Sequence, residues 1–205
     1  MKIILTVLIC LCVLVGGCGG KKEDGNTGVV KPNLPSPKAV PVNIDNPIVE
    51  EAIREELTNE DGEWIGESPK GKLTKVDLEK VTSLYLAFRE LTEVPKGLEK
   101  LDQLKTLFLN DNKLADVTGL EKLTQLTRLY LNDNKLADVT GLEKLTQLKT
   151  LWLEGNQLTE VTGLEKLTQL TNLNLDYNQL TDVKGLEKLT HLTNLNLDYN
   201  QLTDV

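Results

Sequence analysis

From Val81 onward, leucines recur at fixed positions along the chain. The stretch from Leu104 to Leu114 has the spacing L-x-x-L-x-L-x-x-N-x-L. A first copy, starting at Val81, is degraded, because it carries Arg89 where asparagine is expected and precedes the next copy by 23 residues. This self-similarity predicts a repeat architecture over 81–205, with one degenerate copy and five further copies, the last incomplete. After the set ending at Leu114, the pattern returns every 22 residues, in sets that end at Leu136, Leu158, Leu180 and Leu202.

Within each copy, the L-x-L segment alternates like a half-buried strand. Because successive side chains of a strand point to opposite faces, we expect Leu107 and Leu109 to face inward and Phe108 outward. One copy cannot bury its own leucines, so neighbouring copies must stack and pair their strands in parallel. Each copy continues as V-x-G-L-E-K-L, which predicts a glycine turn and a short return across the convex side. The predicted fold is an α/β solenoid with a parallel concave β-sheet, short 3₁₀/helical convex segments and a small helical N-terminal cap.

Residues 44–80 have the punctuation of that helical cap. Asp45 or Asn46 can cap a helix, and a proline follows at the first helical position. Further along, Thr74 and the acid three residues later have the spacing of a capping box. Trp64, the one aromatic residue outside the repeats, is expected to close the cap against the first leucine layer.

Residues 1–17 are predicted to be a lipoprotein signal peptide. One basic residue precedes the apolar run Ile3–Val15, which is shorter than the roughly 20 residues of a membrane-spanning helix. The run leads into V-G-G-C, which resembles the lipobox of bacterial lipoproteins, where the cysteine, here Cys18, is acylated. A plain secretory signal with an incidental cysteine is the alternative. Residues 18–43 then form the acylated cysteine and a flexible, proline-containing linker.

This signal predicts a membrane-anchored lipoprotein of the bacterial cell envelope that faces outside the cytoplasm. Two or more acyl chains, such as palmitate, anchor a protein stably to a membrane. Cleavage before Cys18 leaves 22 basic and 31 acidic residues, a formal charge of −9. An acidic chain of this kind is a poor candidate for binding nucleic acid, so its partner is expected to be neutral or basic.

The repeats resemble the 22-residue leucine-rich repeats of bacterial internalins and of eukaryotic phosphatase regulators. The segment that begins N-P-I-V-E-E-A-I-R-E-E-L is similar to the helical cap that precedes such repeats in many bacterial surface proteins. The likeness covers about Ile44–Val205 and implies a leucine-rich-repeat horseshoe. It is highly specific for the fold and weakly specific for the function.

One asparagine in each of the five good copies has a predicted structural role. Where the chain leaves the strand and turns, buried backbone groups lose their ladder partners. An amide side chain both donates and accepts, so stacked asparagines can satisfy these groups, each of which costs roughly 1–3 kcal/mol if it is left unpaired. The predicted ladder consists of Asn112, Asn134, Asn156, Asn178 and Asn200.

The letters that vary between copies predict the ligand-binding face. One column lies between the two inward leucines, and a second lies two to three positions further on. Seven of the eight aromatic residues occupy these outward strand positions, so we expect one aromatic row on the concave sheet, bordered by acids. Exposed Tyr and Trp dominate binding hot spots, although neighbouring aromatics also stabilise a sheet. The predicted ligand-binding residues are Tyr85, Phe88, Phe108, Asp111, Arg128, Tyr130, Asp133, Trp152, Glu154, Asn174, Asp176, Tyr177, Asn196, Asp198 and Tyr199.

The sequence has no recognisable catalytic arrangement. The single histidine, His191, lies in a return segment, and no Ser or Cys nucleophile stands at a matching position. There is no phosphate-cradling glycine loop and no His/Cys metal spacing. The acid columns have the oxygen ligands that Ca²⁺ takes, but adjacent carboxylates on a solvated sheet need no metal. We therefore predict no catalytic residues, no metal, no cofactor and no enzyme activity.

The predicted function is a lipid-anchored extracytoplasmic module that binds a protein or peptide ligand on the concave face. The alternatives are a carbohydrate-binding surface protein, an adhesin by analogy with internalins, or a regulatory subunit that docks onto an enzyme. The chain stops at Val205, partway through a copy and without a polar C-terminal cap. Three explanations for the missing cap are considered, in order of preference: the sequence is a fragment, the gene is truncated, or the open end pairs with another molecule.

Overall fold

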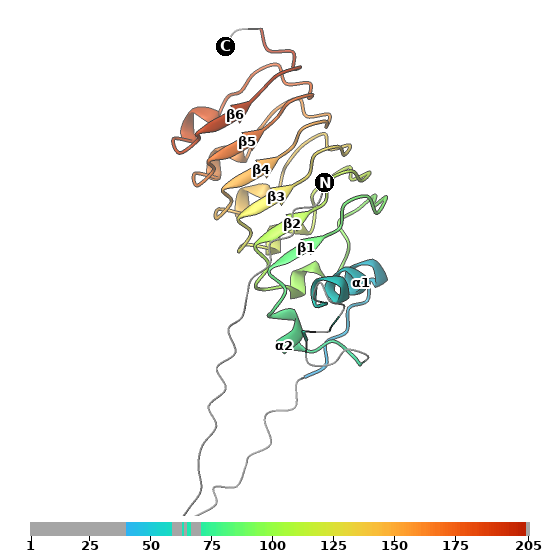
Figure 1. Cartoon of the computed structure of the whole chain (residues 1–205). Helices are drawn as coiled ribbons and strands as arrows, with labels where there is room; N and C mark the ends of the chain where they lie inside the picture. The colour runs from blue at the N-terminus through green and yellow to red at the C-terminus, as the bar shows by residue number, and fades with distance from the viewer. Residues whose placement is uncertain (1–39, 59–62, 64, 67–70, 204–205) are drawn as a thin grey trace, which may run out of the picture. The chain divides into compact units, whose positions relative to one another are not determined.

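Six short strands form one parallel sheet, in the order in which they occur along the chain (Figure 1). The computed structural model describes residues 40–58, 63, 65–66 and 71–203. One strand comes from each predicted copy, so the predicted parallel sheet is confirmed. The strands are β1 (Ser83–Tyr85), β2 (Thr106–Phe108), β3 (Arg128–Tyr130), β4 (Thr150–Trp152), β5 (Asn172–Asn174) and β6 (Asn194–Asn196).

The leucines of the strands form the core, as their spacing predicts. Leu107 pairs with Leu129, and Leu129 with Leu151, so each inward leucine stacks on its counterpart in the next copy. All three side chains are fully buried, and they belong to one continuous cluster of buried apolar residues that runs from the cap through the repeats. Burying a leucine side chain stabilises the fold by about 1.5–3 kcal/mol, so the stacked copies supply the stability that no single copy has.

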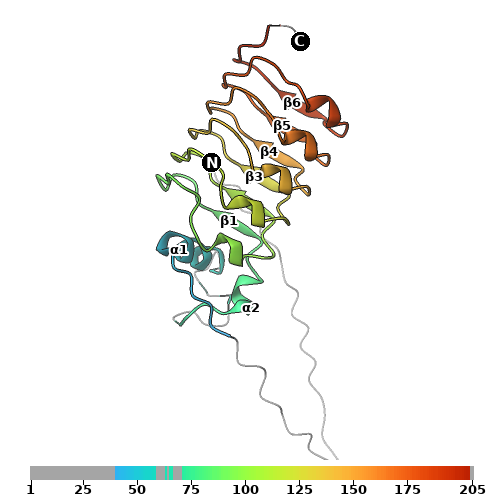
Figure 2. The same ribbon diagram turned by 180° about the vertical axis from the view of Figure 1, so that it is seen from behind.

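Short 3₁₀ helices return the chain between successive strands, and Figure 2 shows them stacked along one side of the solenoid. A glycine with φ between 97° and 108° precedes each helix, a conformation that glycine adopts without steric cost. The glycine N–H donates to the glutamate carboxylate two residues later at 2.5–2.7 Å. The helices are η1 (Leu98–Lys100), η2 (Leu120–Lys122), η3 (Leu142–Lys144), η4 (Leu164–Lys166) and η5 (Leu186–Lys188).

Two helices form the N-terminal cap, and the first of them packs against β1. Helix α1 (Pro47–Glu56) is capped by Asn46, whose side-chain oxygen accepts from the backbone N–H groups of Ile48 and Val49. Helix α2 (Lys75–Leu78) begins with the predicted capping box at Thr74. The buried face of α1 covers the leucine layer of β1, so the cap closes this end of the core.

The ordered cap begins slightly before the predicted boundary at Ile44. Pro41 forms an antiparallel bridge with Thr74, and the Val42 N–H donates to the carbonyl of Leu73 at 2.7 Å. Residues 40–43, which the sequence predicts to be the end of the linker, thus belong to the cap, because their backbone finds hydrogen-bond partners there. The predicted signal peptide, Cys18, most of the predicted linker and Trp64 lie outside the described residues.

The last strand is less buried than the others. Leu195 of β6 is 41% exposed, whereas its partner Leu173 in β5 is buried. In β2–β5, each inward leucine is covered by the copies on both sides of it, whereas β6 has a described neighbour on one side only. Within the described ranges, none of the helices combines the length and the apolar character that a membrane span requires.

Candidate ligand-binding face

Four aromatic rings from consecutive strands stand side by side on the sheet. The parallel register places Tyr85 beside Phe108, Phe108 beside Tyr130, and Tyr130 beside Trp152. The ring centroids of these three pairs are 5.4, 4.6 and 5.2 Å apart, in tilted, stacked and edge-on geometry respectively. Tyr85 is 52% exposed and Trp152 41%, and the two inner rings are half-buried. We call these four side chains the aromatic row.

The row stops at β4, because asparagine occupies the same strand position in β5 and β6. Asn174 pairs with Trp152 in the register, and Asn196 pairs with Asn174. The Asn174 side chain donates to a carboxylate oxygen of Glu154 at 2.9 Å and accepts from the Asp176 backbone N–H at 3.0 Å. The same backbone position thus presents rings in one part of the sheet and amides in the other.

The single aromatic row that the sequence predicts is wrong in one respect, because three of its seven rings are not on strands. Phe88, Tyr177 and Tyr199 lie in the turns that follow the strands, with φ between 54° and 59°. Each strand is only three residues long, so the chain has already turned when it reaches this second column. Tyr177 and Tyr199 stack with their centroids 4.2 Å apart, and we call them the tyrosine pair. Phe88 is exposed at the β1 end.

The predicted acids fall into two columns at these turns. Asp111 and Asp133 share the left-handed turn position with the tyrosine pair, and each accepts from the asparagine that precedes it. Glu154, Asp176 and Asp198 lie one residue earlier in their copies, where the Asp176 carboxylate accepts from the Asp198 backbone N–H at 2.7 Å. Among the described residues, none of these five carboxylates has a salt-bridge partner.

The tyrosine pair is coupled to this acidic surface. A side-chain hydrogen bond with Tyr199 is the main cause that raises the pKa of the Tyr177 phenol, and the nearby charges of Glu154 and Asp176 add to the rise. The phenol of Tyr177 therefore keeps its proton to a higher pH than an ordinary tyrosine, because its pKa is raised. Arg128 opens β3 with an exposed side chain at the first position of the strand. It is the one basic residue among the fifteen predicted.

The ladder asparagines sit behind the face and make the same contacts in every copy. The amide nitrogen of Asn134 donates to the carbonyls of Leu109, Leu131 and Asn132, at 3.0, 3.1 and 3.3 Å. Its oxygen accepts from the Leu114 backbone N–H at 3.0 Å. Four of the ladder side chains are buried and the last is half-buried, so they fix the turns that carry the variable residues: Asn112, Asn134, Asn156, Asn178 and Asn200.

Arg89, which replaces asparagine in the first copy, ties the repeats to the cap. Its backbone N–H donates to the side chain of Asn112 in the next copy, beside the ladder bond that Leu91 makes to the same oxygen. Its guanidinium group instead reaches α1 and pairs with Glu51 and Glu55, each at 3.0 Å. The sequence shows that Arg89 departs from the repeat, but it did not lead us to predict a role for this residue. The signal that was available is the spacing of the two glutamates, which places them on one side of a helix.

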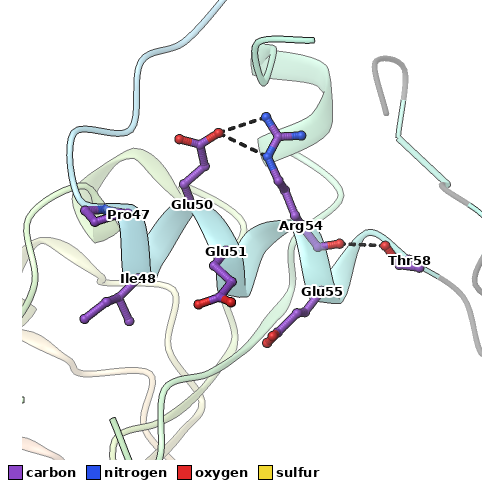
Figure 3. A pocket seen from close by; sticks show the side chains of 7 residues that line it. All are labelled: Pro47, Ile48, Glu50, Glu51, Arg54, Glu55 and Thr58. Carbon is purple, nitrogen blue, oxygen red and sulfur yellow. Dashed lines mark hydrogen bonds and ion pairs between the residues drawn. The ribbon is translucent and has the colours of Figure 1, made fainter. Parts of the chain in front are cut away.

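An open hollow of about 850 Å³ follows α1, and Figure 3 shows the side chains that line it. Its charged groups are already engaged: Arg54 pairs with Glu50 at 2.8 Å, and the other two glutamates bind Arg89. It is lined by Pro47, Ile48, Glu50, Glu51, Arg54, Glu55 and Thr58. Because α1 and Thr58, two residues beyond its end, supply all of these side chains, the hollow is a surface depression of the cap.

Reactive and metal-binding groups do not gather elsewhere on the described chain. His191 is exposed, and its Nδ1 lies 3.0 Å from the carbonyl oxygen of Thr168. No group of three or more His, Cys, Asp or Glu side chains within the ranges described is placed to hold a metal ion. The acid columns, which the sequence left open as calcium ligands, are therefore not arranged as a metal site in this structure.

Comparisons with known proteins agree with the geometry. A model described as "Leucine Rich repeats (2 copies)" matches residues 124–166 and 168–205, and another, "Leucine rich repeat", matches residues 79–136. The crystal structure of internalin C2 from Listeria monocytogenes is 32% identical with a TM-score of 0.69, over 81% of this chain and 71% of that one. The internalin inlF of the same species is 26% identical with a TM-score of 0.51, over 82% and 61%. No curated protein matches the chain by sequence.

The family follows from these matches together with the six stacked strands. Leucine-rich-repeat proteins and their internalin-like relatives are typically non-enzymatic binding modules, and such domains generally bind protein partners. The chain spans less than two thirds of the length of the internalin inlF, and more than two thirds of internalin C2. With internalins among its structural neighbours, the chain belongs to the leucine-rich-repeat family.

Proposed function

We propose that the protein binds a protein or peptide ligand on the sheet face that carries the aromatic row. The main support is the continuity of the four rings, which stay in contact with one another across β1–β4. The side chains at the two ends, Tyr85 and Trp152, are nevertheless 52% and 41% exposed. Rigid aromatic side chains lose little conformational entropy when they are buried in an interface, and they are enriched among the residues that dominate binding energy. The row is thus a preformed docking strip for apolar side chains of the ligand.

Acids at the β4 end of the row and in the next two copies indicate the charge of the partner that fits. Glu154, Asp176 and Asp198 follow one another just after the strands of consecutive copies, and like charges at neighbouring positions repel. Among the described side chains, no lysine or arginine forms a salt bridge with them. A ligand with apolar groups for the row and basic groups for these carboxylates offsets that repulsion on binding.

A display experiment tests the role of the row. Peptides that bind the purified chain are selected from a random display library, and their affinities are then measured for Tyr130→Ala/Trp152→Ala. Losing two hot-spot side chains is expected to weaken binding at least about 30-fold. Tyr177→Ala/Tyr199→Ala is the matched control, because it removes two exposed rings outside the row. If the first variant keeps its fold by circular dichroism and its full affinity, the aromatic row is not the binding site.

We further propose that the module works outside the cytoplasm, held to a membrane through an acylated Cys18. The support is the sequence alone: an apolar run after one basic residue, and the small residues before the cysteine. Radioactive palmitate is expected to label the wild-type chain in the bacterial host and to leave Cys18→Ser unlabelled. Equal labelling of the two chains removes the anchor from the proposal and leaves the binding face unaffected.

A further inference from the structure

A small hollow lies next to the end of the aromatic row, and its lining is uncharged. Its volume is about 170 Å³, less than the roughly 300 Å³ at which sites for drug-sized ligands begin. Trp152 of β4 borders one side, and asparagines of β5 and β6 supply the polar groups. We call this hollow the amide pocket; besides the backbone of Leu173, it is lined by Trp152, Asn172, Asn174, Asn194 and Asn196.

The hydrogen bonds of the four amides show which groups face the pocket unused. Asn174 is held through both of its polar atoms, by Glu154 and by the Asp176 backbone. Asn172 donates to the Thr171 hydroxyl, which leaves its oxygen without a partner within the described ranges.

The β6 amides are more open. The Thr193 hydroxyl, which has one hydrogen, lies 3.0 Å from both the Thr171 carbonyl and the Asn194 amide, so one polar atom of that amide is left over. The Asn196 side chain makes no hydrogen bond with any described residue. The pocket therefore offers four free amide groups, oxygens as well as nitrogens, beside one indole ring. Donors and acceptors are mixed at short range, and a charged side chain does not line the pocket.

We propose that the amide pocket binds one ring of a neutral carbohydrate. A sugar hydroxyl donates one hydrogen bond and accepts others, so neighbouring hydroxyls match alternating amide oxygens and nitrogens. The C–H face of the ring is apolar and suits the flat indole of Trp152, which is 41% exposed. The edge-on contact with Tyr130 supports that indole from the side of the row.

A peptide matches this lining less well. An extended chain carries one N–H and one C=O per residue, about 3.3–3.6 Å apart. Crossing from β5 to β6, which lie roughly 4.8 Å apart, it meets the four free amide groups with only one or two residues. A basic side chain would find no carboxylate in the lining, and an apolar one would leave the amides without hydrogen-bond partners, which is unfavourable.

This binding is separate from the proposed docking of a protein on the row. Replacing Asn174 and Asn196 by tyrosine fills the pocket and continues the row into β5 and β6. The scaffold accepts such a ring at this position, because Tyr130 already occupies it in β3 with the same backbone register. The variant is therefore expected to fold, to lose the carbohydrate and to keep any ligand of the row.

Fluorescence titration tests the proposal. In the Trp64→Phe background, Trp152 is the sole tryptophan. The probes are malto-, cello-, chito-, laminari- and mannohexaose at up to millimolar concentration. At least one is expected to change the Trp152 emission saturably. N174Y/N196Y should weaken the affinity for that sugar about tenfold or more, because two hydrogen bonds are lost. Asn110→Tyr/Asn132→Tyr, the same change outside the pocket, should leave it unaltered.

Every other outcome counts against the amide pocket as a sugar site. The proposal is overturned if none of the five probes binds, or if N174Y/N196Y binds as well as its parent. It is also overturned if peptides selected on the wild-type chain lose affinity with N174Y/N196Y while the sugars do not bind. Tyr85→Ala/Phe108→Ala separates the two hypotheses, because it removes half of the aromatic row without touching the pocket, so only peptide binding should fall.

Discussion

Strands β1–β4 and strands β5–β6 use one backbone and present different chemistry. In the first region, the outward strand position is aromatic, and the following turn carries Phe88, two aspartates or Gly155. In the second region, the strand position is asparagine, and the turn carries the tyrosine pair. Rings and polar groups have exchanged columns between β4 and β5, while the leucines and the ladder amides behind them repeat without change.

This exchange teaches that the scaffold decides positions and leaves the surface free. Asn134 in the first region and Asn178 in the second donate to backbone carbonyls at equivalent positions of their copies. The donor–acceptor distances of corresponding bonds agree within about 0.2 Å. Because the contacts of the leucines and ladder asparagines do not depend on the outward residue, a substitution at the outward position changes the binding surface and leaves these contacts in place. Two adjacent surfaces of different chemistry can therefore arise on one sheet without any change in the fold.

The largest expected effect comes from breaking the leucine stack in one region and comparing it with the other. Leu151→Ala in β4 removes a fully buried side chain with copies on both sides. It should lower the free energy of unfolding by about 2–5 kcal/mol, through lost burial and the cavity left behind. Leu195 of β6 has the same register position but is 41% exposed. Leu195→Ala should therefore lower the free energy of unfolding by less than about half as much as Leu151→Ala. Urea denaturation followed by circular dichroism measures both, and equal losses would contradict the comparison.

A smaller effect is expected from the ladder. The Asn156 side chain is buried and bonds four backbone groups, so Asn156→Ala leaves several of them unpaired and should cost about 1–3 kcal/mol. Asn200 makes the equivalent bonds but is half-buried, so water can replace its side chain. Asn200→Ala should therefore be clearly milder in the same urea titration. A larger loss at Asn200 would mean that burial does not set the value of these bonds.

The fold could be predicted because its signal is redundant. The inward leucines of the L-x-L segments repeat in every copy, and only stacking buries them, so Leu107 and its counterparts determine sheet, register and core together. The cap was also accessible, since Thr74 and Asn46 carry local capping signals that do not depend on distant contacts.

The details of the face could not be predicted as fully. The sequence places Tyr177 in a column of outward residues, but it does not say that the strand ends three residues earlier and that the backbone turns left-handed there. The end of a strand depends on the hydrogen bonds of neighbouring copies, which single letters do not encode. The pairing of Arg89 with α1 is likewise a contact between segments far apart in the chain.

The aromatic columns give a third and weaker contrast. Tyr130 contacts a ring on each side, so Tyr130→Ala should lower the free energy of unfolding by about 0.5–1.5 kcal/mol for each pair lost. Tyr177 has one ring partner and a φ of 54°, a conformation that costs a side-chain residue about 1–2 kcal/mol. Tyr177→Gly loses the stacking and relieves this cost, so it should be nearly neutral, as Gly155 at the same position suggests. Thermal denaturation of the two variants distinguishes a supporting row from a tyrosine pair that contributes little to stability.

The smallest expected effect comes from pH and should act on both regions alike, because it belongs to the return segments. Glu143 lies in the return segment that leads into β4, and Glu165 in the one that leads into β5. Each carboxylate accepts hydrogen bonds from its own backbone N–H and from the N–H of the glycine two residues earlier, and these bonds hold its pKa below the ordinary value of 4.5. The unfolded chain then binds more protons than the folded chain as the pH falls below about 4.5. The stability from these bonds is thus complete above that pH and is lost as the pH drops through the lower, folded-state pKa.

Unfolding midpoints in urea at pH 7, 5, 4 and 3 measure this loss against Glu143→Gln/Glu165→Gln. The glutamine oxygen still accepts from the glycine N–H but does not titrate, so the double variant should lose less stability between pH 5 and pH 3 than the wild type. The difference should be small, because both carboxylates are solvent-screened. Since Glu143 lies in the return segment that leads into β4 of the first region and Glu165 in the one that leads into β5 of the second, the two single variants should flatten the acid slope equally. A slope that changes for only one of them would show that the two regions differ in their scaffold as well as in their surface.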